Sequence, residues 1–110
     1  MTSKTQMQEQ IEELKGNVLK MSKLVEERLH DAIESLIKRD SQLAQQVIDR
    51  DDEIDRFDNL IDDLCLRLLR SDQTKETDLR FVTMAMKIVT DLERMGDYAV
   101  NVAKRSDFVK

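Results

Sequence analysis

Apolar residues recur at steps of three and four over three long stretches of the chain. This spacing is typical of amphipathic α-helices that bury one face against their neighbours. A sheet would need alternating apolar and polar positions, and no such alternation of any length is present. The three stripes consist of Met7, Ile11, Leu14, Val18, Met21, Val25, Leu29, Ala32 and Leu36, then Ile54, Phe57, Ile61, Leu64 and Leu68, and finally Val82, Ala85, Val89, Leu92, Gly96, Ala99, Val100 and Ala103.

Two polar joints separate the predicted helices. Asp40 or Ser41 can cap the helix after the first joint, and Thr77 or Asp78 the helix after the second. The pattern predicts helices over about residues 7–38, 42–70 and 78–106. Because short joints make neighbouring helices antiparallel, we expect an all-α fold, a long antiparallel three-helix bundle that forms a single domain over residues 1–110. A bundle this slender covers its stripes incompletely, so we expect a further partner, within the same molecule or from another.

Composition narrows the class of protein. The 110 residues include no Pro and two Gly, which is typical of long helices with short joints. A net charge of −5 argues against nucleic acid as the main ligand, because phosphate binding needs a basic face. The lone Cys65 excludes a disulfide framework and fits a reducing compartment. No apolar run is long enough to span a membrane, and residues 1–10 are too polar for a signal peptide, so we expect a soluble, cytoplasmic protein.

Acidic residues concentrate in the second predicted helix, where eight of the 15 residues from 49 to 63 are Asp or Glu. At about 100° per residue, four of them lie within roughly 60° of one another and beside the apolar stripe. Like charges at these steps repel and destabilise a helix by a few tenths of a kcal/mol per pair. We therefore expect a bound cation, or basic side chains of a neighbouring helix, to compensate. The four are Asp51, Asp55, Asp58 and Asp62.

The third predicted helix carries a matching feature. Glu93 and Asp97 are four residues apart on one face, Gly96 lies within the apolar stripe, and Asn101 continues the row one turn later. A glycine inside a helix costs about 1 kcal/mol relative to alanine, and its common use in a packed stripe is to let another backbone approach. If the second helix approaches there, its aspartates meet Glu93 and Asp97. Oxygen donors without imidazole or thiolate suit Mg²⁺, Ca²⁺, Mn²⁺ or Fe³⁺ and do not suit a structural zinc.

Two other interpretations compete with the metal site. Acidic rows on helices are commonly solvated faces, and nearby Arg50, Arg56 and Arg94 can pair with them at i,i+3 or i,i+4. On this interpretation the chain is a structural helical oligomerisation domain without metal. An enzyme with a carboxylate-bridged metal pair is the weakest hypothesis, because His30 is the only histidine and points away from the core stripe. Cys65 lies among leucines and is expected to be buried and unreactive. We expect no catalytic residues and no enzyme.

The segment from Asp91 to Lys104, DLERMGDYAVNVAK, resembles the signature helix of the PhoU phosphate-signalling proteins, which carries a Glu/Asp-x-x-x-Asp motif. Residues 78–80 resemble the family's entry to that helix, and residues 51–55 resemble its second helix. The resemblance extends over about residues 14–104. This resemblance favours a metal site over solvated rows of acidic residues. The spacing of the acidic residues alone does not favour the metal site.

The resemblance implies a fold and a ligand set. PhoU-like proteins are built from repeated three-helix bundles, usually two per chain, and some members bind iron, manganese, magnesium or zinc where the signature helix faces acidic residues of the helix before it. Carried over by position, Glu93 and Asp97 are the first candidate ligands. Asp51, Asp55 and Asp58 come next, and Asn101 comes last.

The resemblance also implies a biological role. Members of the family are negative regulators of phosphate uptake that connect the ATPase of the phosphate ABC transporter with a sensor histidine kinase. The chain is then a cytoplasmic adaptor that reaches the membrane only through these partners. Because it holds one repeat where the typical member holds two, it is a single-repeat homologue, a fragment or a designed truncation. A homodimer is expected to rebuild the two-repeat arrangement and cover the exposed stripes.

Overall fold

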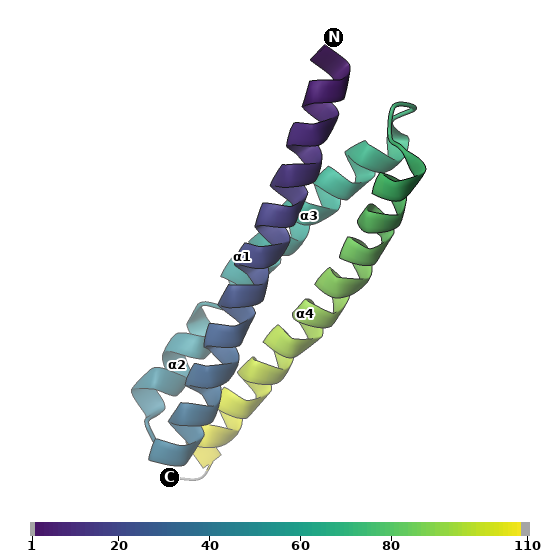
Figure 1. Cartoon of the computed structure of the whole chain (residues 1–110). Helices are drawn as coiled ribbons and strands as arrows, with labels where there is room; N and C mark the ends of the chain where they lie inside the picture. Colours follow the sequence, from purple (N-terminus) through teal and green to yellow (C-terminus); the bar gives the residue numbers. More distant parts are fainter. Residues whose placement is uncertain (1, 109–110) are drawn as a thin grey trace.

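Four helices form three long rods in the computed structural model, which describes the backbone of residues 2–108 and the side-chain environments of residues 6–105. The helices are α1 (Thr2–Lys38), α2 (Ser41–Asp49), α3 (Asp52–Arg70) and α4 (Glu76–Phe108), with no strand in this range. α2 and α3 follow one another along one rod, so α1 and α4 run in the same direction (Figure 1). The Cα trace measures 60 × 19 × 15 Å. The predicted all-α helical bundle is confirmed; residues 1, 109 and 110 of the predicted domain lie outside the described part.

The prediction of one continuous second helix is wrong, because this helix is interrupted at Arg50 and Asp51. α2 ends where the Arg50 N–H donates to the carbonyl of Gln46, and α3 restarts with Asp51 at its N-cap. Aspartates compete with helical hydrogen bonding inside a helix but are favoured in its first turn. The first turn of α3 contains Asp52, Glu53 and Asp55. The dense acidic run therefore starts a new helix, where the helix dipole offsets part of the repulsion.

Of the two predicted helix caps, only the one at the first joint is confirmed. The Leu43 N–H donates to the Asp40 carboxylate at 3.1 Å, which confirms the predicted cap of α2. Thr77 and Asp78 do not cap α4, because this helix begins at Glu76 and both residues lie in its first turn. The second joint is held instead by Thr74, whose hydroxyl donates to the Leu68 carbonyl at 2.7 Å.

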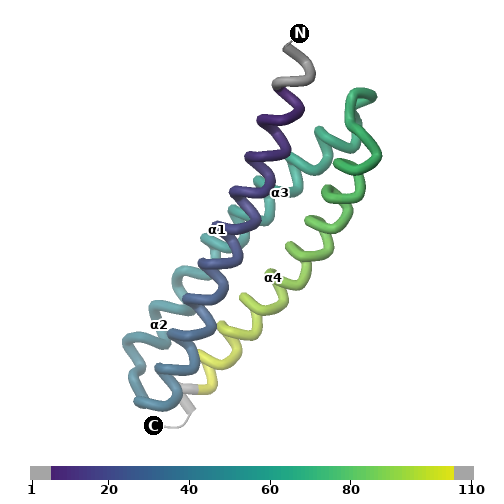
Figure 2. Tube along the Cα trace, in the orientation of Figure 1, coloured from purple at the N-terminus to yellow at the C-terminus, as the bar shows by residue number. Residues whose placement is uncertain are grey.

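The apolar stripes meet in two clusters along the bundle. The larger cluster joins α1, α3 and α4, and contains fully buried residues such as Leu14, Met21 and Leu64. The smaller cluster joins α1, α2 and α4 near the end of α1, where the rods converge (Figure 2). It consists mainly of small side chains, which allow the helices to approach closely. Its buried members are Ala32, Ala44, Val47, Ala99 and Ala103.

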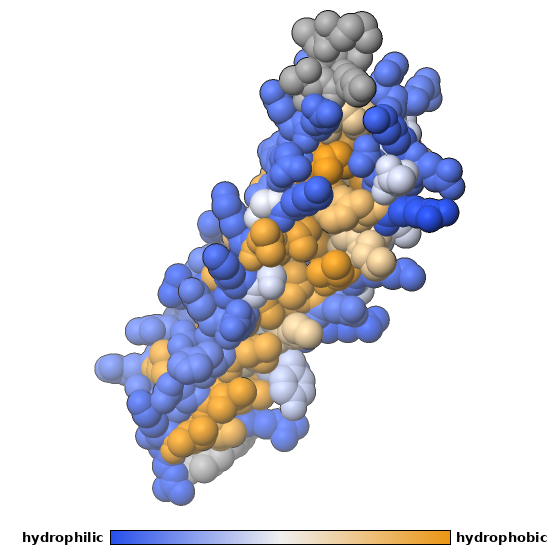
Figure 3. Space-filling view, viewed as in Figure 1, coloured by the Kyte–Doolittle hydropathy of each residue, from blue (hydrophilic) through white to orange (hydrophobic). Residues whose placement is uncertain are grey.

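On the face seen in Figure 3, an apolar band runs between hydrophilic side chains where α1 and α4 lie. Within residues 2–108, no helix combines the length and apolar content that a membrane span requires.

Candidate functional site

α3 and α4 approach each other closely at Gly96. This residue is buried, and a Cβ added to it would lie 3.0 Å from Cδ1 of Ile54 and 3.5 Å from its Cγ2. The absence of a side chain therefore leaves room for Ile54 of α3 to sit against α4. The predicted close approach of the two helices at this glycine is confirmed, and it brings their acidic faces together.

Asp58 on α3 and Glu93 on α4 meet beside this contact. A hydrogen bond with Asp58 is the largest cause that raises the pKa of Glu93 to about 7, and partial burial and the charges of Asp58, Asp55 and Asp97 add to it. Two carboxylates within hydrogen-bond reach repel each other when both are ionised. Glu93 therefore keeps its proton to a higher pH than an ordinary glutamate does.

Asp51 extends the acidic region toward the joint between α2 and α3. Burial is the largest cause that raises the pKa of this carboxyl, followed by the charges of Asp55, Asp97 and Asp52, while Lys104 acts in the opposite direction. The charges of Asp55 and Asp58 therefore act on Glu93, and that of Asp97 acts on Asp51, across the seam between α3 and α4. We call Asp51, Asp55, Asp58, Glu93 and Asp97 the carboxylate cluster.

The carboxylate cluster is diffuse. Among the residues that the structure describes, no three His, Cys, Asp or Glu side chains converge as a metal site requires. Asn101, the last candidate ligand, lies exposed on α4 one turn beyond Asp97. The assignment of these residues as metal ligands stays a prediction, and any cation would have to draw the side chains together.

Other acidic residues of α3 are paired with arginines on its surface. Arg56 donates to Asp52 at 3.2 Å, and Arg50 donates to Glu53 at 2.7 Å. These are the i,i+4 and i,i+3 pairs that the solvated interpretation expects. That interpretation describes Asp52, which is exposed and lies outside the carboxylate cluster, whereas Glu53 also binds a side chain of α1.

Sequence reasoning missed one buried charge. Arg28 of α1 is only 3% exposed, and its Nη2 donates to Glu53 Oε1 of α3 at 3.0 Å. Its Nε is buried without a hydrogen-bond partner among the described residues. The signal was available, because Arg28 follows Met21 and Val25 and precedes Ala32 at the spacing of the core stripe.

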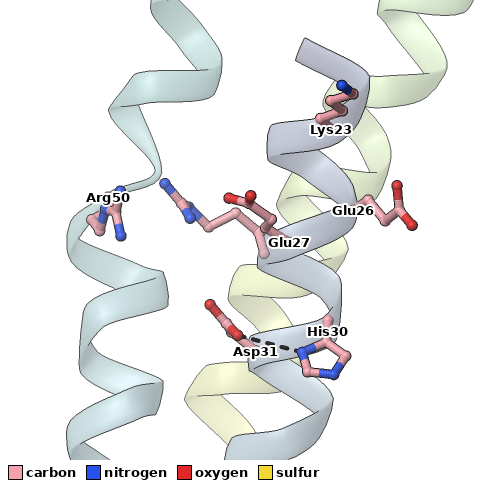
Figure 4. A pocket seen from close by; sticks show the side chains of 7 residues that line it. Lys23, Glu26, Glu27, His30, Asp31 and Arg50 are labelled. Carbon is pink, nitrogen blue, oxygen red and sulfur yellow. Dashed lines mark ion pairs between the residues drawn. The ribbon is translucent and has the colours of Figure 1, made fainter. Parts of the chain in front are cut away.

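A shallow groove of about 540 Å³ lies beside Arg28, between α1 and Arg50 (Figure 4). Three acidic side chains line the groove together with Lys23 and the two arginines, so the groove does not select an ion by its charge. His30 at its edge lies 3.5 Å from Asp31 and is 71% exposed, which confirms it as a surface residue. The acidic residues are Glu26, Glu27 and Asp31.

Cys65 is fully buried, as the sequence predicted. Burial is the largest cause that raises the pKa of its thiol to about 11, and the charge of Asp62 adds to it. Because the thiolate is the nucleophilic form, this cysteine is unreactive near neutral pH.

Comparison with known proteins gives a consistent result. The family model described as PhoU domain matches residues 18–106. A phosphate-specific transport system accessory protein PhoU homolog from Pseudomonas putida is 41% identical over 92% of this chain and 40% of its own length. A homolog from Aquifex aeolicus is 44% identical over 88% of this chain and 44% of its own length. The PhoU protein of Escherichia coli (strain K12) is 33% identical over 90% of this chain and 41% of its own length.

A solved structure is similar in both sequence and fold. The crystal structure of PhoU from Pseudomonas aeruginosa superimposes with a TM-score of 0.86 and 41% identity, over 90% of this chain and 47% of that one. The chain thus spans less than half the length of these relatives.

Proposed function

Because the chain belongs to the PhoU family, we propose that it regulates phosphate uptake as an accessory domain and not as an enzyme. The names of the curated relatives, phosphate-specific transport system accessory proteins, support this role. The fold similarity to a PhoU crystal structure over 90% of the chain supports it as well. The unreactive thiol and the exposed lone histidine fit a protein that acts by binding.

The proposed partners are components of phosphate transport and sensing. The chain would act in the cytoplasm on the ATPase of the phosphate ABC transporter and on a sensor histidine kinase, and would lower kinase output when phosphate is plentiful. Its location at the membrane would then depend on these partners alone. The relatives' names support the link to the transport system.

The second part of the proposal is that the carboxylate cluster binds a metal cation. The observation that carries it is the contact between Asp58 and Glu93, which places two carboxyls together and raises the pKa of Glu93 to about 7. A cation can neutralise the same pair in place of the proton. The donors are all oxygens, which fits magnesium, manganese or iron better than zinc.

Each residue of the cluster would have a defined role. Asp58 and Glu93 would hold the cation first, Asp97, Asp51 and Asp55 would complete the site, and Asn101 could reach it last. The bound charge would offset the repulsion between α3 and α4, and would stabilise the seam at Gly96. No chemical step is required of the metal on this proposal.

Elemental analysis of the purified chain tests the metal site. We expect about one equivalent of a divalent or trivalent metal in the native protein, and a loss of about tenfold or more in Asp58→Asn/Glu93→Gln. The matched control is Asp63→Asn/Asp91→Asn, which removes the same charge from exposed positions on the same two helices. Equal metal content in the native protein and the cluster variant would contradict the site.

A phosphate-starvation reporter in cells that lack this protein tests the regulatory role. We expect reporter output to stay high in phosphate-rich medium, and to fall again when the native chain is restored. The Asp63→Asn/Asp91→Asn control should repress as the native chain does, and Asp58→Asn/Glu93→Gln should repress less. Output that does not change when the protein is removed would contradict the proposed role.

The second candidate function is a structural helical oligomerisation domain without metal. The observation in its favour is that no three potential ligands converge in the described part of the chain. It predicts the same, background metal content in the native protein and both variants, so the elemental analysis separates the two proposals.

A further inference from the structure

Another groove lies at the end of the bundle where the N-terminal part of α1 meets the joint between α3 and α4 (Figure 1). Its volume is about 480 Å³, within the roughly 300–1,000 Å³ of small-molecule sites. The groove beside Arg28 has three acidic side chains in its lining, whereas no Asp or Glu of the described chain lines this one. We call it the arginine groove. Its polar lining consists of Gln6, Gln10, Arg67, Arg70, Ser71 and Gln73.

Two arginines bring positive charge to the arginine groove without carboxylate partners. Arg67 and Arg70 are both exposed in the last turn of α3. Within residues 6–105, neither forms an ion pair, whereas four other arginines do. Asp63 lies only four residues before Arg67 on the same helix, and it too leaves this arginine unpaired. Because a guanidinium stays charged near neutral pH, both positive charges are available to a ligand.

The end of α3 offsets only part of this charge. The carbonyl groups at the C-terminus of a helix carry a partial negative charge of about half an elementary charge, which favours a basic residue in the last turn. Arg67 and Arg70 together carry two full positive charges, which exceed this value. The chain as a whole has a net charge of −5, so the arginine groove is a local positive region on an acidic protein. Such a region attracts an anion.

The joint beside the arginines is fixed by its own hydrogen bonds. The Thr74 hydroxyl donates to the Leu68 carbonyl at 2.7 Å, and its oxygen lies 3.4 Å from Sδ of Met7 on α1. The Gln73 N–H donates to the Ser71 hydroxyl oxygen at 3.1 Å. The hydroxyl proton of Ser71 can then be donated to a ligand. These contacts position the joint against both helices, which lowers the entropic cost of binding there.

We propose that the arginine groove binds a phosphate group, either as the free ion or as part of a small phosphorylated molecule. A phosphate dianion has oxygens for two guanidinium groups, whereas one guanidinium is enough to neutralise a carboxylate. The side-chain amides of Gln6, Gln10 and Gln73 supply further hydrogen-bond donors, and acceptors for hydroxyl groups attached to the phosphate. The inference rests on the lining and charge of this groove, and it depends neither on the carboxylate cluster nor on a role in phosphate uptake.

An NMR titration of the isotope-labelled full chain tests the proposal. The probes are inorganic phosphate and adenosine monophosphate, at constant ionic strength set with sodium chloride. The pH is about 7.5, where a phosphate group with a second pKa of about 6 is mainly a dianion. We expect the side-chain N–H signals of the groove's arginines and glutamines to shift, with a Kd of about 1 mM or tighter for at least one probe. The probe that binds more tightly identifies the source, a free ion or a phosphorylated molecule.

A pair of variants separates the arginine groove from general attraction between charges. Arg67→Gln/Arg70→Gln should weaken binding by about tenfold or more, because it removes both charged donors. The matched control is Arg94→Gln/Arg105→Gln, which removes the same charge from α4. These two arginines are also exposed, and they have no ion pair in the described part of the chain. Arg70→Gln alone is the second variant, and circular dichroism shows which variants are folded.

The proposal is supported if either probe shifts the signals of the arginine groove and a folded arginine variant binds more weakly than the control. It is overturned if neither probe binds the native chain at concentrations up to about 10 mM. It is also overturned if the signals that shift lie elsewhere in the chain, or if the control weakens binding as much as the loss of the groove's arginines does. The titration of the native chain gives this answer even if a variant does not fold.

Discussion

Replacing Glu53 by alanine is expected to lower the free energy of unfolding by about 3 kcal/mol, because it leaves a buried charge without its partner. Arg28 is 3% exposed and its guanidinium is bound by Glu53 across the contact between α1 and α3. Glu53 also accepts a hydrogen bond from Arg50 at the break before α3. One carboxylate therefore fixes both the start of α3 and its position on α1. Urea denaturation followed by circular dichroism measures the loss.

Two controls separate the buried pair from surface charge. Asp52→Ala removes the neighbouring exposed pair with Arg56 and is expected to cost no more than about 0.5 kcal/mol. The double variant Arg28→Met/Glu53→Leu replaces both buried groups by apolar ones and is expected to recover most of the lost stability. If Glu53→Ala costs no more than Asp52→Ala, the buried pair does not stabilise the bundle as argued.

Several features were predictable because they depend on spacing along a single helix. The core stripes were read from period alone, and the most buried positions, such as Leu14 and Ile61, fall on them. Gly96 was predicted as a point of close approach because a glycine inside a packed stripe is costly unless a neighbour uses the space. The cap at Asp40 follows from the chemistry of one residue.

Other features depend on free-energy balances that the spacing of residues along the chain does not show. The apolar period of the second rod continues across the break at Arg50, so the hydrophobic pattern did not predict this break. The free-energy cost of aspartates inside a helix does not appear in such a pattern. The burial of Arg28 was not predicted, because a charged residue within an apolar stripe indicates a break in the stripe unless its partner on another helix is known. The spacing places several carboxylates beside the apolar stripes, but whether they converge on one point depends on side-chain rotamers and helix separation.

Raising the pH from 5 to 8 is expected to destabilise the metal-free protein by about 1–2 kcal/mol through Glu93. Its pKa is about 7 in the folded chain, where a hydrogen bond with Asp58 is the largest cause of the rise, against an ordinary value of 4.5. The folded state therefore binds this proton more tightly than the unfolded state does. The stabilisation is complete below pH 4.5, declines as the pH rises, and is lost above about 7. Asp51 acts in the same direction, since burial raises its pKa too.

Urea denaturation in the presence of a chelator, at one protein concentration and at several pH values, measures this dependence. Glu93→Gln keeps a hydrogen-bond donor toward Asp58 and removes the titration, so its stability should change less over the same range and exceed that of the native chain at pH 8. Glu53 does not interfere, because the hydrogen bond from Arg50 lowers its pKa and its effect falls below this range. Parallel curves for the native chain and Glu93→Gln would show that the pKa of Glu93 is not raised in the folded chain, and would remove the main support for a cation beside Asp58.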